Sequence, residues 1–323
     1  MFIRFFGIML DEASFKTMNN PLVSVIIPNY NHARYLDERI QSILNQTYQN
    51  FELIILDDKS TDNSLEIINK YKNNSHVSCV VINEENSGST FKQWHKGFEL
   101  AKGELIWIAE SDDKCEKEFL SALVPFFERD DSCVLAYVKS VFMQDDGSYQ
   151  HTELGKAPEL FQGVDFIEKK MAFGNSIVNA SSAIFSKAVA QRVNKRYMEY
   201  KGAGDWLFWI EIAEQGNVGI DYRELNFFRI HENNSTKRYY FEGINQREVL
   251  TILKYILEKQ YISKKKFVKA KRLYARWNIY SDRLSPNQKK EICQQWGLGF
   301  IDRICIFWYD IIEVIEYKFG IKI

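Results

Sequence analysis

The sequence predicts an α/β protein built on a mainly parallel sheet with helices on both faces. Four short runs of β-branched and other apolar residues alternate with segments whose apolar residues recur every three or four positions. Strands that are apolar on both faces are typical of parallel sheets covered by helices. The chain has 323 residues, of which 46% are hydrophobic, so it is long enough for one large domain and a smaller appendage.

The first half of the chain contains the clearest elements. Ser60 and Thr61 are candidate N-caps of the second helix, and Gly103 closes the third. The fourth strand runs directly into the acidic segment 110–113 (ESDD). Ligands of such sheets bind beyond the carboxyl ends of the strands, so we expect the functional site at this edge. The strands are expected at 22–28, 51–57, 77–82 and 105–109, and the helices around 36–44, 65–71 and 91–101.

The second half has a mixed pattern. A long strand is expected at 133–143, and the sequence DDG at 145–147 is typical of a hairpin turn. From about residue 243 onward the pattern is helical, so 241–323 is interpreted as a helical C-terminal region. Residues 1–20 are expected to form a poorly ordered extension. Between these limits we expect helices at 164–173 and 205–215, a polar segment at 175–182, and strands at 218–221 and 225–231.

Composition excludes several classes of protein. The 42 Lys and Arg residues nearly balance the 43 Asp and Glu residues, which gives no general attraction for nucleic acid. The five cysteines are odd in number and form no C-x-x-C pair, so neither a structural zinc site nor a disulfide framework is expected. No run approaches 18 uncharged apolar residues, so no transmembrane helix is expected. The cysteine usage fits a reducing cytosol, and we expect a cytoplasmic protein that can lie peripherally at the cytoplasmic face of the membrane. The oligomeric state cannot be predicted from these data.

Three phosphate-binding or nucleophile motifs are absent from the sequence. It contains no G-x-G-x-x-G, no G-x-x-x-x-G-K-[ST] and no G-x-S-x-G, which argues against a dinucleotide-binding, P-loop or α/β-hydrolase protein. The turn after the first strand is PNYN, and it cannot cradle a phosphate as a glycine-rich loop does. If a nucleotide binds, the charge of its diphosphate must be balanced elsewhere.

A divalent metal held by the acidic segment at the end of the fourth strand would balance that charge. Glu110, Asp112 and Asp113 supply hard oxygen ligands, which suit Mg²⁺ or Mn²⁺ held together with substrate phosphates. Asp57 and Asp58, at the end of a neighbouring strand, add two more carboxylates. Alternatively, Asp112 and Asp113 cap a helix that begins at about residue 116. We favour the metal site because two acidic strand ends share one edge.

At this point a family resemblance is evident. The run VSVIIPNYNHARYLDERIQSILNQTYQNFELIILDDKSTDNS and the later run NSGSTFKQWHKGFELAKGELIWIAESDD resemble the family 2 glycosyltransferases. The resemblance is dense over residues 22 to about 130 and sparser to about 235. It implies a GT-A fold over 21–240, similar to other nucleotide-diphospho-sugar transferases. It also implies transfer of a sugar from a nucleotide sugar to a glycan or lipid-linked acceptor, in cell-surface polysaccharide or glycolipid assembly.

The resemblance also implies site residues. Asp112 matches the metal-binding carboxylate of the D-x-D motif, whose first Asp is replaced here by Glu110, beside Ser111. His231 and Arg229 match a late R-x-H element, where the histidine meets the metal or the diphosphate and the arginine neutralises phosphate charge. Residues matching the nucleotide-binding segments of the family are Pro28, Asn29, Tyr30, Asp57, Asp58, Asn86, Gly88 and Lys92.

The catalytic base is expected at Asp205, in the sequence GAGDW, because it resembles the base position of the family. Direct displacement of a nucleotide diphosphate needs a carboxylate that accepts the proton of the acceptor hydroxyl. Alternatively, Asp205 is simply a charge at a helix N-terminus. Such a position makes a carboxyl more acidic, so burial or substrate would have to restore its basicity. The segment 179–182 is expected near donor and acceptor, or else is an ordinary polar turn.

Two further interpretations remain open. The basic segment 264–276 either lies on an anionic membrane as a peripheral contact or is a solvated helix packed by its apolar face. The acidic polar residues of 300–319 favour packing on the catalytic domain or on a partner over contact with an anionic bilayer. The competing functions are a sugar-nucleotide nucleotidyltransferase, which would need a glycine-rich first loop, and a non-catalytic sugar-binding relative of the fold.

Overall fold

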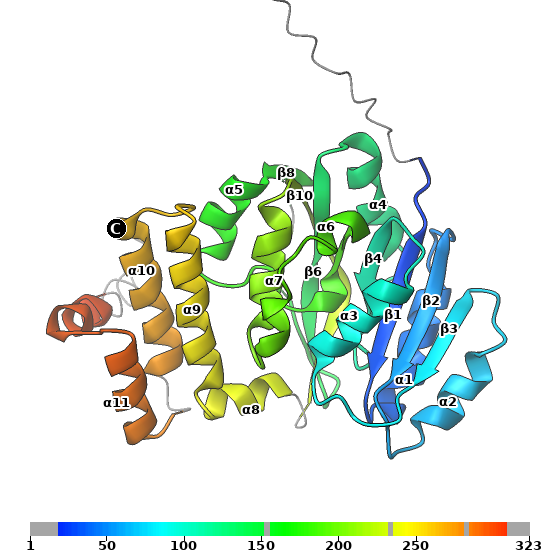
Figure 1. Cartoon of the computed structure of the whole chain (residues 1–323), viewed down its shortest axis with the longest axis horizontal. Coiled ribbons are helices and arrows are strands. Elements are labelled where there is room, and N and C mark those ends of the chain that lie inside the picture. Colours follow the sequence, from blue (N-terminus) through cyan, green and yellow to red (C-terminus); the bar gives the residue numbers. More distant parts are fainter. Residues whose placement is uncertain (1–18, 152–155, 232–234, 281–283, 309–323) are drawn as a thin grey trace, which may run out of the picture.

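The computed structural model describes residues 19–151, 156–231, 235–280 and 284–308. The predicted α/β class is confirmed. A ten-stranded sheet runs through the protein in the order β3-β2-β1-β4-β9-β6-β10-β5, with β7 pairing with β6 and β8 with β10 (Figure 1). The expected extension 1–20 falls almost wholly outside the described residues.

The first four strands are parallel, as predicted, and bring their carboxyl ends to one edge. Their residues are nearly all apolar, and those of the three inner strands are buried on both faces. Gly103 lets the chain pass close to the backbone of β1, since an added Cβ would lie 2.4 Å from the carbonyl oxygen of Leu22. The strands are β1 (Val23–Asn29), β2 (Phe51–Asp57), β3 (Val77–Ile82) and β4 (Leu105–Ile108).

The rest of the sheet departs from the predicted pattern at β9 (Ala183–Ser186). This short strand was not expected, and it inserts antiparallel between β4 and β6. The two late strands are a single strand, β10 (Asn217–Ile230), whose register shifts between Asp221 and Asn226. The remaining strands are β5 (Lys114–Cys115), β6 (Cys133–Gln144), β7 (Tyr149–Gln150) and β8 (Glu159–Gln162).

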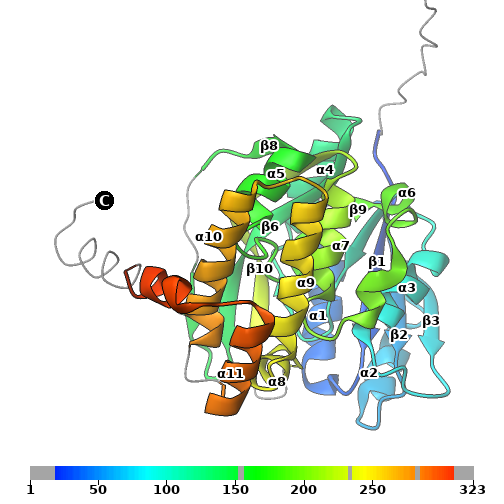
Figure 2. The same ribbon diagram turned by 60° about the vertical axis from the view of Figure 1, so that its left-hand side comes forward.

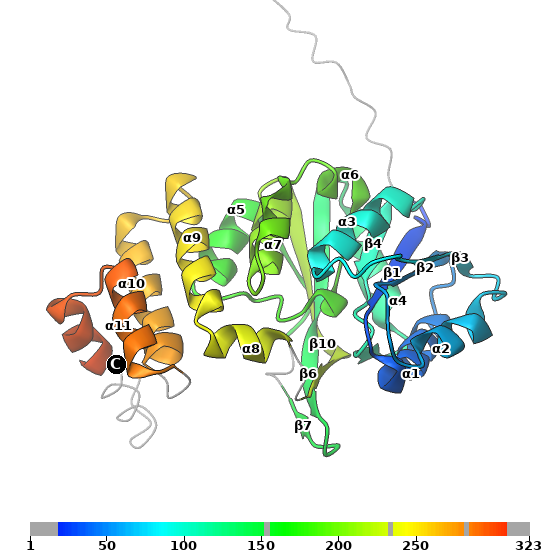
Figure 3. The same ribbon diagram turned by 60° about the horizontal axis from the view of Figure 1, so that its bottom comes forward.

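Helices cover both faces of the sheet and form two hydrophobic clusters (Figures 1 and 3). On one face lie α1 (Ala33–Leu44), α2 (Ser64–Tyr71) and α4 (Phe119–Arg129). On the other lie α3 (Thr90–Leu100) and α7 (Gly204–Ala213), with the short elements α5 (Gly163–Phe166), η1 (Ile167–Met171), η2 (Ala180–Ser182), α6 (Lys187–Ala190) and η3 (Lys195–Glu199) nearby.

The C-terminal region is helical, as predicted, and stands at the end of the molecule away from β3 (Figure 2). Buried residues of its helices belong to the same hydrophobic cluster as α3 and α7. No helix among the described residues is long and apolar enough to cross a membrane. The elements are α8 (Ser235–Phe241), α9 (Ile244–Glu258), α10 (Lys264–Tyr274), η4 (Ala275–Ile279), α11 (Pro286–Gln295) and a helix over 300–308.

The predicted N-caps of α2 are wrong. Ser60 and Thr61 do not cap α2, which begins at Ser64 with Asn63 at the N-cap position. The Ser60 hydroxyl instead accepts a hydrogen bond from the backbone N–H of Asn31, and Thr61 donates its backbone N–H to the Asn31 side chain. These bonds join the loop after β2 to the loop after β1, next to the site.

Candidate active site

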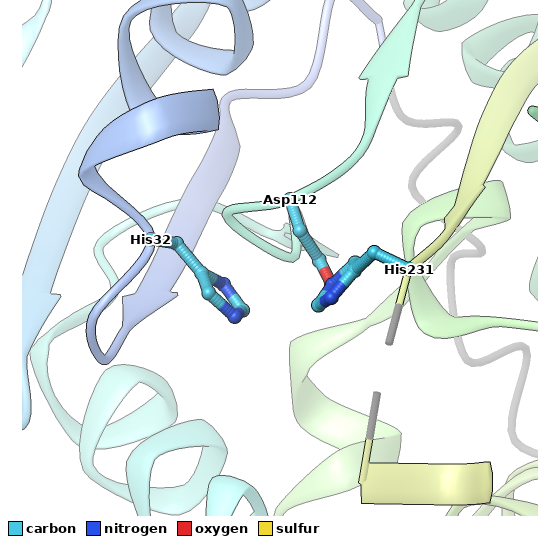
Figure 4. Close-up of side chains that lie close together, drawn as sticks. All are labelled: His32, Asp112 and His231. Atoms are coloured by element: carbon cyan, nitrogen blue, oxygen red, sulfur yellow. The ribbon is translucent and has the colours of Figure 1, made fainter. Parts of the chain in front are cut away.

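Three segments far apart in the sequence meet at the carboxyl edge of the sheet. His32 lies just before α1, Asp112 follows β4, and His231 follows β10. Their side chains point toward one another (Figure 4), and one ligand atom from each lies within 4.8 Å of the others. Nε2 of His231 is 3.0 Å from Oδ2 of Asp112. The sequence predicted Asp112 and His231 but assigned no role to His32.

The orientation of His32 is fixed by its other ring nitrogen. Nδ1 lies 2.8 Å from the hydroxyl of Ser111, which leaves Nε2 for the cluster. Burial lowers the pKa of His32 despite the charge of Asp112, so its neutral form, which can bind a metal, is favoured. Burial alone would raise the pKa of Asp112, but the hydrogen bond with His231 and the electrostatic interactions with both imidazoles outweigh it and lower that pKa. Asp112 is thus held as a carboxylate.

Asp113 fixes the position of the acidic segment through hydrogen bonds to two other parts of the chain. Its carboxylate accepts a 2.7 Å hydrogen bond from the Asn179 side chain and a 2.9 Å bond from the backbone N–H of Arg229. Asn179 in turn accepts hydrogen bonds from Ser140 and Asn226. The segment 179–182, one of whose interpretations was a polar turn, is therefore a buried support of the acidic segment.

The capping interpretation of Asp112 and Asp113 is wrong. The chain passes from Asp113 into β5, and α4 begins only at Phe119, with Glu118 at its N-cap position. Burial and the charge of Asp112 raise the pKa of Asp113 to about 7, although Arg39 acts in the opposite direction. Arg39 is fully buried, with its guanidinium over the ring of Trp107.

Glu110, the first residue of the D-x-D-like motif, lies outside the cluster of His32, Asp112 and His231. Its carboxylate accepts a 2.8 Å hydrogen bond from the indole of Trp94 on α3, and its backbone N–H donates to the hydroxyl of Ser181. Burial and the charge of Asp112 raise its pKa to about 8. The replacement of Asp by Glu therefore gives a longer side chain that reaches the first turns of α3.

Arg229 ties the end of β10 to the acidic segment and to α1. Its Nε donates to the carbonyl oxygen of Asp112 at 2.7 Å, and its guanidinium pairs with Glu38 and lies 4.5 Å from the ring centroid of Tyr35. These contacts hold the guanidinium against the protein. They do not test its predicted contact with phosphate.

The loop after β1 is built around Asn29 and Asp57. The Asn29 side chain donates to Asp57 at 2.8 Å, and the backbone N–H of Ser60 donates to the other carboxylate oxygen of Asp57. Both oxygens of this fully buried carboxylate are thus engaged. Pro28 is buried in β1, whereas the Tyr30 ring is 46% exposed beside it. Tyr30 is therefore the residue of this segment that is open to a ligand.

Asp58 organises the loop that leads into α3. Its carboxylate accepts hydrogen bonds from the side chains of Asn83, Ser87 and Gln93. Its carbonyl oxygen accepts one from Asn86. The turn at 86–88 requires a left-handed residue, which Gly88 supplies with φ +66°. Lys92 is exposed at the start of α3, with Nζ 3.5 Å from the carbonyl oxygen of Ser87.

Asp205 lies in the first turn of α7, next to the face of α3 that carries Phe91 and Trp94. Gly204 packs against Phe91, and Phe91 lies edge-on to Trp94, the partner of Glu110. The Asp205 carboxylate accepts a 2.9 Å hydrogen bond from Asn175. Burial raises the pKa of Asp205 to about 7 and outweighs the bonds that lower it. The acidifying effect expected at a helix start is therefore reversed.

A residue that the sequence analysis missed holds the loop before Asp205. Glu248 of α9 accepts backbone hydrogen bonds from Lys201, Gly202 and Ala203 at 2.7–2.8 Å. No local pattern marks Glu248, because its partners lie 45–47 residues away in the sequence. His32 was missed for the same reason, since Ser111 is 79 residues away.

Comparison with known proteins identifies the family of the chain. The model of the family described as "Glycosyl transferase family 2" matches residues 24–193. The chain is 36% identical over 218 residues to a putative teichuronic acid biosynthesis glycosyltransferase, TuaG, of Bacillus subtilis, covering 66% of this chain and 81% of that protein. An uncharacterized glycosyltransferase of Haemophilus influenzae is 28% identical over 232 residues, covering 69% and 70%.

Solved structures share the fold. Staphylococcus aureus TarS 1–349 in complex with UDP-GlcNAc is similar with a TM-score of 0.54 and 21% identity, over 85% of this chain and 71% of that one. The mannosyltransferase PcManGT of Pyrobaculum calidifontis, in complex with GDP-Man and Mn²⁺, is similar with a TM-score of 0.56 and 16% identity, over 92% and 81%. The predicted GT-A type fold is thus confirmed, and the chain belongs to glycosyl transferase family 2 and is a glycosyltransferase.

Proposed function

We propose that the protein transfers a sugar from a nucleotide-diphosphate sugar to an acceptor hydroxyl, with inversion at the anomeric carbon. The observation that carries this proposal is the cluster of His32, Asp112 and His231 at the carboxyl edge of the sheet. The donor class is supported by the two similar structures, one of which binds UDP-GlcNAc and the other GDP-Man.

The cluster suits a divalent metal. One carboxylate and two imidazoles make a mixed oxygen and nitrogen donor set, and imidazole favours first-row transition metals over Mg²⁺. We therefore expect Mn²⁺ in preference to Mg²⁺, in line with the Mn²⁺ of PcManGT. When bound, the cation would supply positive charge that stabilises the leaving diphosphate.

The other predicted binding residues would contact the nucleotide sugar or position the loops around it. Tyr30, exposed beside β1, offers a ring for stacking on the base. Asn86 and Lys92 are exposed on the loop organised by Asp58, where they flank the nucleotide. Asn29 and Asp57 fix these loops by hydrogen bonds, while Pro28 and Gly88 shape their backbones. Arg229 adds positive charge next to Asp112.

Asp205 acts as the base in a single displacement. The acceptor oxygen forms a bond to the anomeric carbon, the bond from that carbon to the diphosphate oxygen breaks, and the proton of the acceptor hydroxyl passes to the Asp205 carboxylate. A pKa of about 7 matches this group to proton transfer near neutral pH. Asn175 orients the carboxylate through its 2.9 Å hydrogen bond.

The proposal is tested by binding and turnover measured on the same variants. Thermal shift with UDP-, GDP- and dTDP-sugars, with Mn²⁺ or Mg²⁺, identifies the donor. Asp112→Asn should abolish metal-dependent donor binding. Asp205→Asn should keep donor binding and lose transfer. Normal turnover by either variant would contradict the assignment, and no shift with any donor would favour a non-catalytic relative.

The acceptor is proposed to be a glycan or a lipid-linked glycan in cell-surface polysaccharide assembly, since TuaG is named for teichuronic acid biosynthesis and TarS as a poly(ribitol-phosphate) β-N-acetylglucosaminyltransferase. A nucleotidyltransferase is the less favoured alternative, because the first loop reads PNYNHAR instead of a glycine-rich sequence. Release of pyrophosphate from a nucleoside triphosphate and a sugar phosphate would identify that activity. The cytoplasmic location stays a prediction.

A further inference from the structure

The helix at 300–308 turns its apolar side toward solvent. At 100° per residue, its exposed apolar side chains fall within one face about 120° wide. The opposite side packs on the protein through Ile306, which is 5% exposed, and through the ion pair of Asp302 with Arg272 of α10. The exposed side chains are Phe300 (79%), Ile301 (69%), Ile304 (41%), Phe307 (61%) and Trp308 (56%). We call them the aromatic face.

This face is unusual for a protein surface. Single exposed apolar residues need no explanation, but a contiguous group with three aromatic rings marks an interaction site. A sixth side chain, Trp277 of η4, is 53% exposed in the same C-terminal region. Trp side chains are enriched where a protein meets the boundary between lipid and water.

The charge of the surrounding region indicates the partner. Residues 263–280 and 284–308 contain ten Lys or Arg and two Asp or Glu, a net charge of +8, whereas the whole chain carries −1. The rest of the chain therefore carries −9. Among the basic residues, Lys264 and Lys265 on α10, Lys290 on α11 and Arg303 beside the aromatic face are exposed. An isologous contact with a second copy would bring two strongly basic regions together.

We propose that the aromatic face docks on an anionic lipid bilayer, with the basic region around it against the headgroups. Apolar burial and attraction of basic residues to anionic lipid together give peripheral binding. This location differs from the peripheral contact predicted for 264–276, and it replaces the packing on the catalytic domain or on a partner that was favoured for 300–319. Tyr274 and Ala270 of α10 are buried and Phe267 packs against the core, so the apolar face of α10 is already covered. The proposal does not depend on the reaction proposed above.

The test is sedimentation of the full-length chain with vesicles of phosphatidylcholine, with and without phosphatidylglycerol. We expect binding that needs phosphatidylglycerol and weakens with salt. Phe307→Ser combined with Trp308→Ser should weaken binding about tenfold or more, because the variant lacks two aromatic side chains that the bilayer would bury. Lys264→Gln combined with Lys265→Gln should also weaken binding, by an amount that disappears at high salt.

A matched control separates this role from a loss of folding. Leu160 of β8 is 48% exposed outside the C-terminal region, and Leu160→Ser should leave vesicle binding unchanged. All variants should retain the far-UV spectrum and transfer to a water-soluble acceptor. Absence of binding to anionic vesicles would overturn the proposal. So would a concentration-dependent dimer that the double Ser variant converts to a monomer, since this would assign the aromatic face to a second copy of the chain.

Discussion

Asp205→Asn should make the protein more stable at neutral and alkaline pH while it removes transfer. Burial raises the pKa of this carboxyl from 3.8 to about 7 in the folded protein. Between these two values the folded protein holds the proton that the unfolded chain has released. The free energy of unfolding therefore falls as pH rises from about 4 to about 7, and it stays low above that range. Asn does not titrate, so the free energy of unfolding of the variant should not fall over this pH range.

The magnitude follows from the shift. About three pKa units correspond to a ceiling of about 4 kcal/mol at about 1.4 kcal/mol per unit. The Asp205 side chain is partly exposed, and solvent screening lowers this value. The amide oxygen of an Asn at this position still accepts the hydrogen bond from Asn175. We therefore expect a gain of about 1–2 kcal/mol at pH 8, or roughly 2–6 °C in the melting temperature, and almost none at pH 4.

The assay is thermal unfolding from pH 4 to pH 8, without donor or added metal. Asp165→Asn is the control, because this carboxylate is exposed and forms an i,i+4 pair with Lys169. The control should melt within about 1 °C of the native protein across the range. Parallel melting curves for Asp205→Asn and the native protein would refute the reasoning, as would a lower melting temperature for this variant at pH 8. Transfer by the native protein should rise with pH and level off above about pH 7.

Further expectations concern the metal, the base loop and one glycine. His32→Ala should weaken Mn²⁺ binding at least about tenfold in calorimetry. His95→Ala is the control, because this partly exposed histidine on α3 lies outside the cluster, and it should leave the affinity unchanged. Equal affinities of the His32→Ala variant and the native protein would exclude His32 as a ligand. Glu248→Gln should lower the turnover number with little change in the Michaelis constant for the donor, because the loop before Asp205 loses charged acceptors; an unchanged turnover number would contradict this role. Gly103→Ala should destabilise the protein by about 1–3 kcal/mol in urea unfolding, since the new Cβ meets the backbone of Leu22 at 2.4 Å. A native unfolding midpoint would show that β1 can shift.

The sequence predicted those elements whose signal is local. The strands β1 to β4 are continuous apolar runs, and their bounds agree with prediction to within about one residue. β9 was missed because four residues carry too little pattern, and its place between β4 and β6 depends on pairing with distant segments. β10 was predicted as two strands because polar residues interrupt its apolar pattern where its register shifts.

The same distinction applies to the site. The acidic segment is visible in the sequence because a strand ends in clustered carboxylates. The sequence does not show which partner each carboxylate contacts. In the structure Glu110 forms a hydrogen bond with Trp94, Asp112 with His231 and Asp113 with Asn179. Each of these partners lies on another element, and only the folded chain brings them together. The sequence can therefore indicate which residues carry charge, but not which atom each carboxylate contacts.

The contacts of Glu248 bear on the division of the chain at residue 240. This residue lies on α9, in the predicted helical region, yet its carboxylate accepts three backbone hydrogen bonds from the loop that leads to Asp205. Val249 and Ile252 of the same helix are buried in the hydrophobic cluster that contains α3 and α7. Without α9 these N–H groups would lose their acceptor, at about 1–3 kcal/mol for each one left without another partner. The loop before Asp205, the proposed base, thus depends on α9, and a region without a recognised motif in the sequence contributes to the geometry of the proposed site.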